Sequence, residues 1–217
     1  MKVEVFRVSN DVMKNQCYLI HHQGSGVLID PAWDYELIDG YLSEHKIVLK
    51  GVMLTHSHKD HVNLAGKFTR EYGVPVYMSA VEVERYDFSC LNLVQLEHLS
   101  KVIWDDFEII ALLTPGHSAG SMCYLVNGHC FTGDTIFIEG VGSCSETDVD
   151  DLYDSVQYLK KQLSRNTLIW PGHSFGMAPG MEMSYLLDNN LYFQLDERDL
   201  FRNFRLRKNR PDPLVFY

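Results

Sequence analysis

The stretch THSHKDH at residues 55–61 places three histidines and an aspartate within six positions, directly after the apolar run at residues 51–54. The apolar run predicts a buried strand that ends at this motif. His56 and His58 lie two residues apart, so in an extended backbone their side chains project from the same face. Two imidazoles on one face of a strand end can reach one metal ion.

Asp60 and His61 follow after a turn, and three more residues of the same types occur later at predicted strand ends or turns. These are His117 in Thr-Pro-Gly-His, Asp134 in Thr-Gly-Asp and His173 in Pro-Gly-His. Imidazole nitrogens and carboxylate oxygens suit zinc and, less selectively, iron or manganese. This number of candidate ligands predicts a site for two ions rather than one. A structural zinc site is disfavoured, because such sites are closed shells of four ligands.

Five further histidines lack this context, and we expect them to be ordinary surface or core residues: His21, His22, His45, His98 and His129. The five cysteines are scattered without a C-x-x-C pair, which predicts neither a disulfide framework nor a zinc finger. We expect reduced, mostly buried thiols. Cys144 is the one to examine, because it lies close in sequence to the motifs above.

Composition limits the class of protein. With 217 residues, 46% of them hydrophobic, the chain is long enough for one domain over residues 1–217 with its own core. The net charge of -10 makes nucleic acid an unlikely class of partner. The N-terminus does not resemble a signal peptide, and no run approaches the roughly 20 apolar residues of a membrane span, so we expect a cytoplasmic protein with no membrane contact.

Hydrophobic patterning predicts an α/β protein in which strands and helices alternate. The expected strands cover residues 2–8, 16–22, 26–30, 51–55, 74–78, 107–114, 121–126, 129–133 and 167–170. The expected helices cover residues 34–45, a segment around Leu64, Phe68 and Tyr72, residues 148–163, and a short helical extension at about 180–217. The apolar residues at helical spacing are Leu37, Ile38, Tyr41 and Leu42 in the first of these, and Leu152, Val156, Leu159 and Leu163 in the third. Asn127-Gly128 predicts a two-residue hairpin turn, whereas residues 80–100 give no clear pattern.

The seven ligand-type residues resemble the metallo-β-lactamase superfamily, whose H-x-H-x-D-H motif is followed by separated His, Asp and His ligands. The resemblance covers about residues 16–175 and implies an αβ/βα sandwich of two facing mixed sheets flanked by helices. It also implies that His56, His58 and His117 bind one zinc, that Asp60, His61 and His173 bind a second, and that Asp134 bridges them. In such a site a shared water becomes the nucleophile, and Asp60 orients it.

Within the superfamily, two stretches resemble the zinc-dependent hydrolases of bacterial trans-acyltransferase polyketide (bacillaene-type) biosynthesis. They are IFIEGVGSCSETDVDDLYDS and LLDNNLYFQLDERDLF. This resemblance implies hydrolysis of an acyl thioester, with an acyl carrier protein as a possible partner, in antibiotic biosynthesis. The alternatives are a mononuclear iron persulfide dioxygenase and a glyoxalase II-type hydrolase of glutathione thioesters. The Lys and Tyr with which glyoxalase II holds glutathione are absent from residues 141–145.

The segment FRNFRLRKNR at residues 201–210 concentrates basic residues in an otherwise acidic chain. These are Arg202, Arg205, Arg207, Lys208 and Arg210. One interpretation is a solvated basic face. The other is that this segment docks an acidic carrier protein or the phosphate of its phosphopantetheine arm, because complementary charge speeds encounter and sets orientation.

Overall fold

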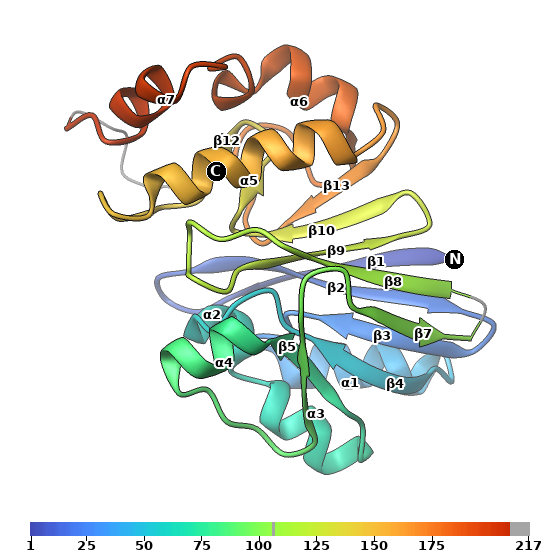
Figure 1. The fold of residues 1–217 in the computed structure, drawn as a ribbon. Helices are drawn as coiled ribbons and strands as arrows, with labels where there is room; N and C mark the ends of the chain where they lie inside the picture. The colour runs from blue at the N-terminus through green and yellow to red at the C-terminus, as the bar shows by residue number, and fades with distance from the viewer. Residues whose placement is uncertain (106, 209–217) are drawn as a thin grey trace. The chain divides into compact units, whose positions relative to one another are not determined.

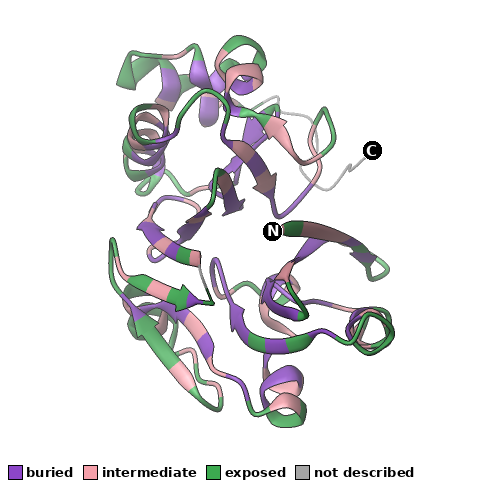
Figure 2. Cartoon of the chain, turned by 90° about the vertical axis from the view of Figure 1, so that its right-hand side faces the viewer, coloured by how far each residue is buried: buried purple, intermediate pink, exposed green. Residues whose placement is uncertain are grey.

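The computed structural model describes residues 1–105 and 107–208 and contains two mixed six-stranded sheets. The chain divides into two compact units, Met1–Leu96 and Glu97–Tyr217, with one sheet in each (Figure 1). Each unit also has its own hydrophobic core. Most residues of the inner strands are buried, for example in β2 and β3, whereas the edge strands β6 and β7 carry exposed residues, as do the turns (Figure 2).

The sheet of the N-terminal unit has the order β1-β2-β3-β4-β5-β6. The first three strands pair antiparallel and the remaining pairs, from β3/β4 onward, are parallel. Its elements are β1 (Lys2–Ser9), β2 (Lys14–His22), β3 (Ser25–Ile29), α1 (Tyr35–Glu44), β4 (Val48–Met53), α2 (Lys59–Val62), α3 (Ala65–Tyr72), β5 (Val76–Ser79), α4 (Ala80–Tyr86) and β6 (Leu93–Leu96).

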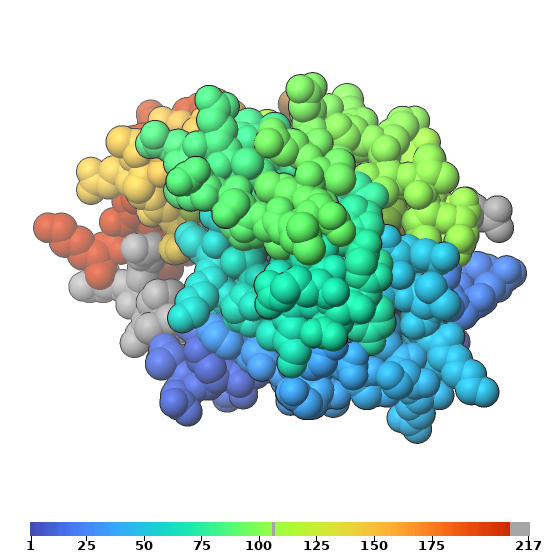
Figure 3. Space-filling view, turned by 90° about the horizontal axis from the view of Figure 1, so that it is seen from below, coloured from blue at the N-terminus to red at the C-terminus, as the bar shows by residue number. Residues whose placement is uncertain are grey.

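Helices α1 and α3 cover one face of this sheet (Figure 1). Ile38 and Leu42 of α1 and Phe68 of α3 are fully or almost fully buried in the core, as the helical spacing predicts. Leu37 was expected on the same apolar face, but it is 46% exposed. The opposite sides of α3 and α4, teal and green in Figure 3, lie on the surface of the unit.

The sheet of the C-terminal unit has the order β14-β13-β10-β9-β8-β7, in which only β10 and β13 pair parallel. Its elements are β7 (Lys101–Trp104), β8 (Phe107–Leu113), β9 (Met122–Val126), β10 (His129–Gly133), β11 (Ile136–Phe137), β12 (Gly140–Val141), α5 (Val149–Gln162), β13 (Leu168–Pro171), β14 (Met181–Glu182), α6 (Met183–Asn189), the 3₁₀ helix η1 (Leu191–Phe193) and α7 (Arg198–Arg205). Strands β11 and β12 form a separate small hairpin.

Local sequence signals explain several of these elements. Asn127 and Gly128 both have positive φ (46° and 78°) and join β9 to β10, so the predicted two-residue hairpin is confirmed. In α5 the predicted apolar stripe is buried against the core, including Leu152, Val156 and Leu159. The region without a clear pattern forms α4, whose N-terminus is capped by the Ser79 hydroxyl, and the edge strand β6.

The segment after β14 is tied to the rest of its unit by buried polar contacts. The Asn190 side chain is fully buried and its Nδ2 lies 3.1, 3.3 and 3.0 Å from the carbonyl oxygens of Phe137, Ile138 and Gly140. Its Oδ1 accepts a hydrogen bond from the backbone N–H of Tyr192. One amide therefore holds η1 to the β11–β12 hairpin. The predicted extension at about 180–217 includes residues 209–217, which lie outside the described residues.

No helix in residues 1–105 and 107–208 combines the length and the apolarity needed to cross a membrane.

Candidate metal centre

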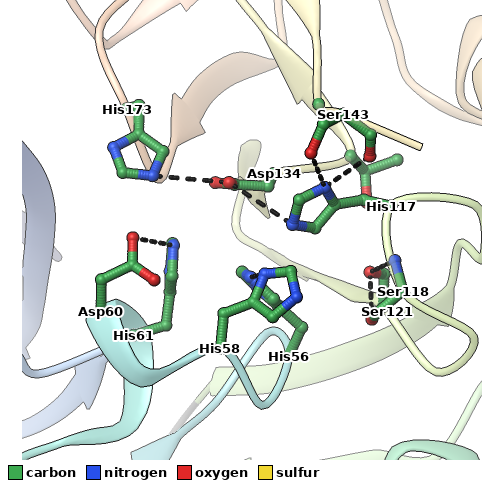
Figure 4. Close-up of polar contacts among 12 residues, drawn as sticks. His56, His58, Asp60, His61, His117, Ser118, Ser121, Asp134, Ser143 and His173 are labelled. Atoms are coloured by element: carbon green, nitrogen blue, oxygen red, sulfur yellow. Dashed lines mark hydrogen bonds and ion pairs between the residues drawn. The ribbon is translucent and has the colours of Figure 1, made fainter. Parts of the chain in front are cut away.

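The ligand-type residues of the N-terminal unit follow β4, in a loop that leads into α2. His56 and His58 lie in the loop, where His58 has extended backbone angles, and Asp60 and His61 lie on α2. His56 Nε2 is 3.0 Å from His58 Nδ1, and His61 Nε2 is 3.5 Å from Asp60 Oδ2 (Figure 4). The four side chains that the motif predicted are therefore close together within this unit.

Asp30, at the end of β3, fixes the orientation of two of these imidazoles. Its carboxylate accepts hydrogen bonds from the Thr55 N–H (2.7 Å), from the Thr55 hydroxyl (2.6 Å) and from His61 Nδ1 (2.9 Å). A carboxylate only accepts, so His61 carries its proton on Nδ1 and presents the lone pair of Nε2. The Thr55 hydroxyl proton is used on Asp30, so the Thr55 oxygen accepts from His56 Nδ1 at 3.0 Å, and His56 also presents Nε2.

Glu82 on α4 holds the loop between the two histidines. Its Oε1 accepts hydrogen bonds from the backbone N–H of Ser57 (2.8 Å) and from the Ser57 hydroxyl (2.7 Å). Glu82 is fully buried, so this carboxylate has exchanged water for these donors. The contact fixes the backbone at the residue that separates His56 from His58.

Asp60 is oriented by a chain of two hydrogen bonds. Asn15, which is buried on β2, donates from Nδ2 to Asp60 Oδ2 at 3.0 Å. Trp33 Nε1 in turn donates to Asn15 Oδ1 at 2.8 Å, which fixes which end of the amide faces Asp60.

The ligand-type residues of the C-terminal unit come from three separate strand ends. His117 follows β8, Asp134 directly follows β10, and His173 follows β13. Figure 4 shows the Asp134 carboxylate between the two imidazoles, with Oδ2 3.6 Å from His117 Nε2 and 3.4 Å from His173 Nε2. The parallel pairing of β10 with β13 places Asp134 and His173 at the same end of the sheet.

A backbone carbonyl fixes the tautomer of His117. Nδ1 of His117 lies 2.7 Å from the carbonyl oxygen of Ser143, and a carbonyl only accepts, so Nδ1 carries the proton and Nε2 presents its lone pair toward Asp134. Residue 142, which precedes Ser143, must be glycine, because a Cβ there would lie 1.8 Å from the carbonyl oxygen of Asp134. The loop at residues 142–143 therefore packs directly against two of the ligand-type residues.

These two clusters pass a geometric test for zinc. Two ligands bound tetrahedrally at about 2.1 Å from one ion are about 3.4 Å apart. The spacings within the clusters are 3.0, 3.5, 3.6 and 3.4 Å. Three imidazoles also present a deprotonated nitrogen, held by an oxygen acceptor on the other ring nitrogen, which is the arrangement usual for histidine ligands of zinc. In each unit, the residues fit a metal ion.

Sequence reasoning missed the residues that hold these ligands in place. Asp30 was interpreted only as a strand end before proline, and Asn15, Glu82 and Ser143 were not singled out. The one usable signal was an aspartate immediately after a continuously apolar strand, where an ionisable side chain becomes buried only with partners. For Glu82 and Ser143 the sequence offers no local signal, because their partners are 25 and 26 positions away.

The described part of the basic segment at residues 201–210 makes several contacts within its own unit. Arg205 is buried and donates to the Gly142 carbonyl, Arg202 pairs with Asp150 at 2.9 Å, and the Arg207 guanidinium lies over the Phe204 ring. Three of these basic residues are thus bound within their own unit, and the docking hypothesis is wrong for Arg205, since a buried side chain cannot meet a carrier. Arg210 lies outside the described residues.

The Cys144 thiol is not activated. Burial raises its pKa, and the neighbouring Arg205 only partly opposes that effect. The thiolate is the reactive form of cysteine, so Cys144 is not a candidate nucleophile.

Comparison with known proteins decides the family. The sequence profile of the Metallo-beta-lactamase superfamily matches residues 11–173, which include all seven ligand-type residues. The chain belongs to the metallo-β-lactamase superfamily. The resemblance stated from the motifs is therefore confirmed.

Two relatives align over almost the whole chain and a third over about three quarters of it. The chain is 41% identical over 213 residues to "Probable polyketide biosynthesis zinc-dependent hydrolase BaeB" of Bacillus velezensis, covering 96% of this chain and 95% of that protein. It is 40% identical, with the same coverage, to "Probable polyketide biosynthesis zinc-dependent hydrolase PksB" of Bacillus subtilis. A "Hydroxyacylglutathione hydrolase" of Shewanella loihica is 30% identical over 169 residues, covering 76% of this chain and 63% of that protein.

Solved structures of the superfamily confirm the expected fold class. A metallo-beta-lactamase from Staphylococcus aureus aligns with a TM-score of 0.85 at 20% identity, covering 98% of this chain and 68% of that one. ETHE1 from Myxococcus xanthus aligns with a TM-score of 0.84 at 26% identity, covering 100% of this chain and 95% of that one. Two mixed sheets flanked by helices are thus the metallo-β-lactamase fold.

Proposed function

We propose that this protein is a zinc-dependent hydrolase that cleaves an acyl thioester, carried on an acyl carrier protein or another thiol, in polyketide biosynthesis. The observation that carries the proposal is the tautomer-fixed set of imidazoles, spaced for metal ligation, in a chain 41% identical over almost its whole length to a probable polyketide biosynthesis zinc-dependent hydrolase.

In this proposal, the seven ligand-type residues of the two units hold two zinc ions. Following the superfamily motif, one ion would be held by His56, His58 and His117 and the other by Asp60, His61 and His173, and Asp134 would serve both. Zinc, when bound, supplies Lewis acidity that activates water and polarises a carbonyl group near neutral pH. Iron or manganese suits the same donors less selectively.

The chain's own residues contribute orientation and proton handling. Asn15 holds one oxygen of Asp60, so the carboxylate is fixed in one plane and accepts a proton from the attacking water. Asp30 keeps the protons of His56 and His61 on the nitrogens that face away from the ligand positions. A thiol has a pKa of about 8.5, so a thiolate leaves without a strong general acid.

The substrate class is tested with one acyl group presented on three thiols. Zinc-loaded protein is assayed with the same acyl chain on coenzyme A, on glutathione and on an acyl carrier protein, and Asp60→Asn serves as the matched control. We expect hydrolysis of the carrier thioester with kcat/KM at least about tenfold above that of the glutathione thioester. The Asp60→Asn variant is expected to bind substrate and to lose turnover.

Two outcomes of this panel would replace the proposal. Preference for the glutathione thioester would favour the glyoxalase II-type reaction named for the Shewanella loihica relative. Oxygen uptake with a persulfide substrate, together with one iron per chain and no thioester cleavage, would favour the dioxygenase alternative. Metal analysis of the purified protein separates the iron dioxygenase from the zinc hydrolases before any kinetic measurement, and the thioester panel then decides which thiol is preferred.

A further inference from the structure

Arg205, the last residue of α7, makes a buried contact that its sequence context does not suggest. Its side chain is only 5% exposed, and both Nε (3.0 Å) and Nη2 (2.7 Å) donate to the carbonyl oxygen of Gly142. Hydrogen bonds from a charged donor are stronger than neutral ones, and two converging donors fix the direction of the carbonyl as well as its position. Arg205 therefore fixes the backbone at Gly142.

The next residue along the chain contacts a ligand-type residue. The Ser143 carbonyl accepts the proton of His117 Nδ1, as described above. Gly142 and Ser143 share one peptide unit, which is planar and rigid, so a displacement of the Gly142 carbonyl moves the Ser143 backbone. Nδ1 of His117 also lies 2.9 Å from the position that a Cβ at Gly142 would occupy, so the backbone at Gly142 packs closely against His117.

The other two arginines of α7 bind elsewhere. Arg198 pairs with Asp154 at 2.6 Å and Arg202 pairs with Asp150 at 2.9 Å, both on α5. These ion pairs attach the same helix to the same unit without touching residues 142–143. Within residues 1–105 and 107–208, Arg205 is the side chain of α7 that hydrogen-bonds to Gly142, whereas Arg202 Nη2 donates to the Glu146 carbonyl farther along the chain. The Gly142 contact and the attachment of the helix can therefore be separated by mutation.

We propose that Arg205 is a positioning residue for the proposed metal ligand His117, acting through the loop at residues 142–143. The proton on His117 Nδ1 stays opposite the Ser143 carbonyl because Arg205 holds the neighbouring carbonyl in place. Helix α7 thereby contributes to the affinity of the site for metal. This inference rests on the proposed function in one respect, namely that His117 binds the metal.

The test compares Arg205→Met with the matched control Arg198→Met on the same helix. Two quantities are measured: the resonances of the His117 ring nitrogens in the metal-free protein, and the zinc affinity by competition with a chelator. We expect Arg205→Met to broaden or shift the Nδ1–H resonance and to weaken zinc binding by about tenfold, the lower end of the range for residues that orient ligands. Arg198→Met should leave the His117 resonances unshifted and the zinc affinity within about twofold of that of the unaltered protein.

Arg205→Lys keeps the result decisive if Arg205→Met does not fold. Lysine retains the charge but cannot place two donors on one carbonyl, so we expect zinc affinity between those of the unaltered protein and Arg205→Met. Zinc affinity within twofold of the unaltered protein in the folded Arg205 variant, or equal losses in the Arg198 and Arg205 variants, would overturn the inference. His117→Ala distinguishes the two proposals: unchanged zinc affinity there would refute the ligand role of His117, whereas the metal-free resonances still report the loop contact.

Discussion

The two ligand clusters reach similar donor spacings by different routes. In the N-terminal unit, four residues within six positions are arranged by one loop and one short helix, and one carboxylate, Asp30, orients two of the imidazoles. In the C-terminal unit, three residues come from three strand ends, and their arrangement depends on the pairing of β10 with β13 and on a loop held from α7. A local motif thus builds one cluster, and tertiary structure builds the other.

Removing one ligand from each unit tests whether the clusters serve one centre. We expect His58→Ala and Asp134→Ala each to lower kcat/KM for the thioester by at least about 1,000-fold, because zinc no longer activates water in either variant. Steady-state kinetics and zinc content per chain measure the effect. If one variant kept both its zinc and most of its activity, the two clusters would not act together.

Asp30→Asn tests the single anchor of the N-terminal cluster. The asparagine amide would donate where Asp30 now accepts, so His61 would move its proton to Nε2 and lose the lone pair offered to zinc. We expect zinc affinity to fall about 10- to 100-fold, measured by chelator competition.

The matched control for this change is Thr55→Val, which removes the hydroxyl between Asp30 and His56 but keeps the contact of Asp30 with His61. Its loss of zinc affinity should be smaller than that of Asp30→Asn. Equal losses would show that orientation of His61 is not the main role of Asp30.

The contact between Glu82 and Ser57 tests how much one buried anchor of the N-terminal cluster contributes to the stability of the fold. Glu82→Ala leaves the N–H and the hydroxyl of Ser57 without their buried acceptor, so the free energy of unfolding should fall by about 1–3 kcal/mol. Glu82→Gln keeps a carbonyl oxygen for the same donors and should cost less. Urea denaturation of both variants measures the difference, and a glutamine variant as unstable as the alanine variant would contradict this assignment.

The smallest expected effect concerns pH and the strand that leads to Asp134. Burial lowers the pKa of His129 below its ordinary 6.5, and Trp170 Nε1 donates to its Nδ1 at 3.0 Å, which requires that nitrogen to be unprotonated. The stabilising contribution is therefore fully present above pH 6.5 and is lost as pH falls through the lowered pKa.

His129→Asn should remove this part of the acid sensitivity. Because His129 is only partly buried, we expect the unaltered protein to lose less than about 0.5 kcal/mol more than the variant between pH 7 and pH 5. Thermal unfolding at a series of pH values measures the difference. Parallel pH profiles would show that His129 does not contribute.

The parts of the molecule that depend on local sequence could be predicted. The Asn127-Gly128 hairpin and the apolar stripe of α5 depend on residues that are close together in the sequence, and both predictions are confirmed. Leu37 was misplaced because α1 buries a narrower stripe than its apolar residues suggest. Residues 80–100 were left unassigned because α4 and β6 are both short, and their stability comes from packing on β5.

The anchors of the site could not be predicted, because they join residues far apart in the sequence. Thr55 is 25 positions from Asp30, and Arg205 is 63 positions from Gly142. Charge patterning places Arg205 among exposed basic residues, since a sequence shows the charge of a side chain but not its burial. The ligand types could be read from the motifs, but the contacts that set their tautomers required the structure.

Asn190 has a consequence for exchanging parts between related proteins. It attaches η1 to the β11–β12 hairpin, and Arg205 attaches α7 to the residues directly after that hairpin. A chimaera that imports a foreign tail from about residue 183 onward would remove the two side chains that donate to these carbonyls. Residues 136–143 and the tail should therefore be transplanted as one block, even though residues 144–182 separate them in the chain.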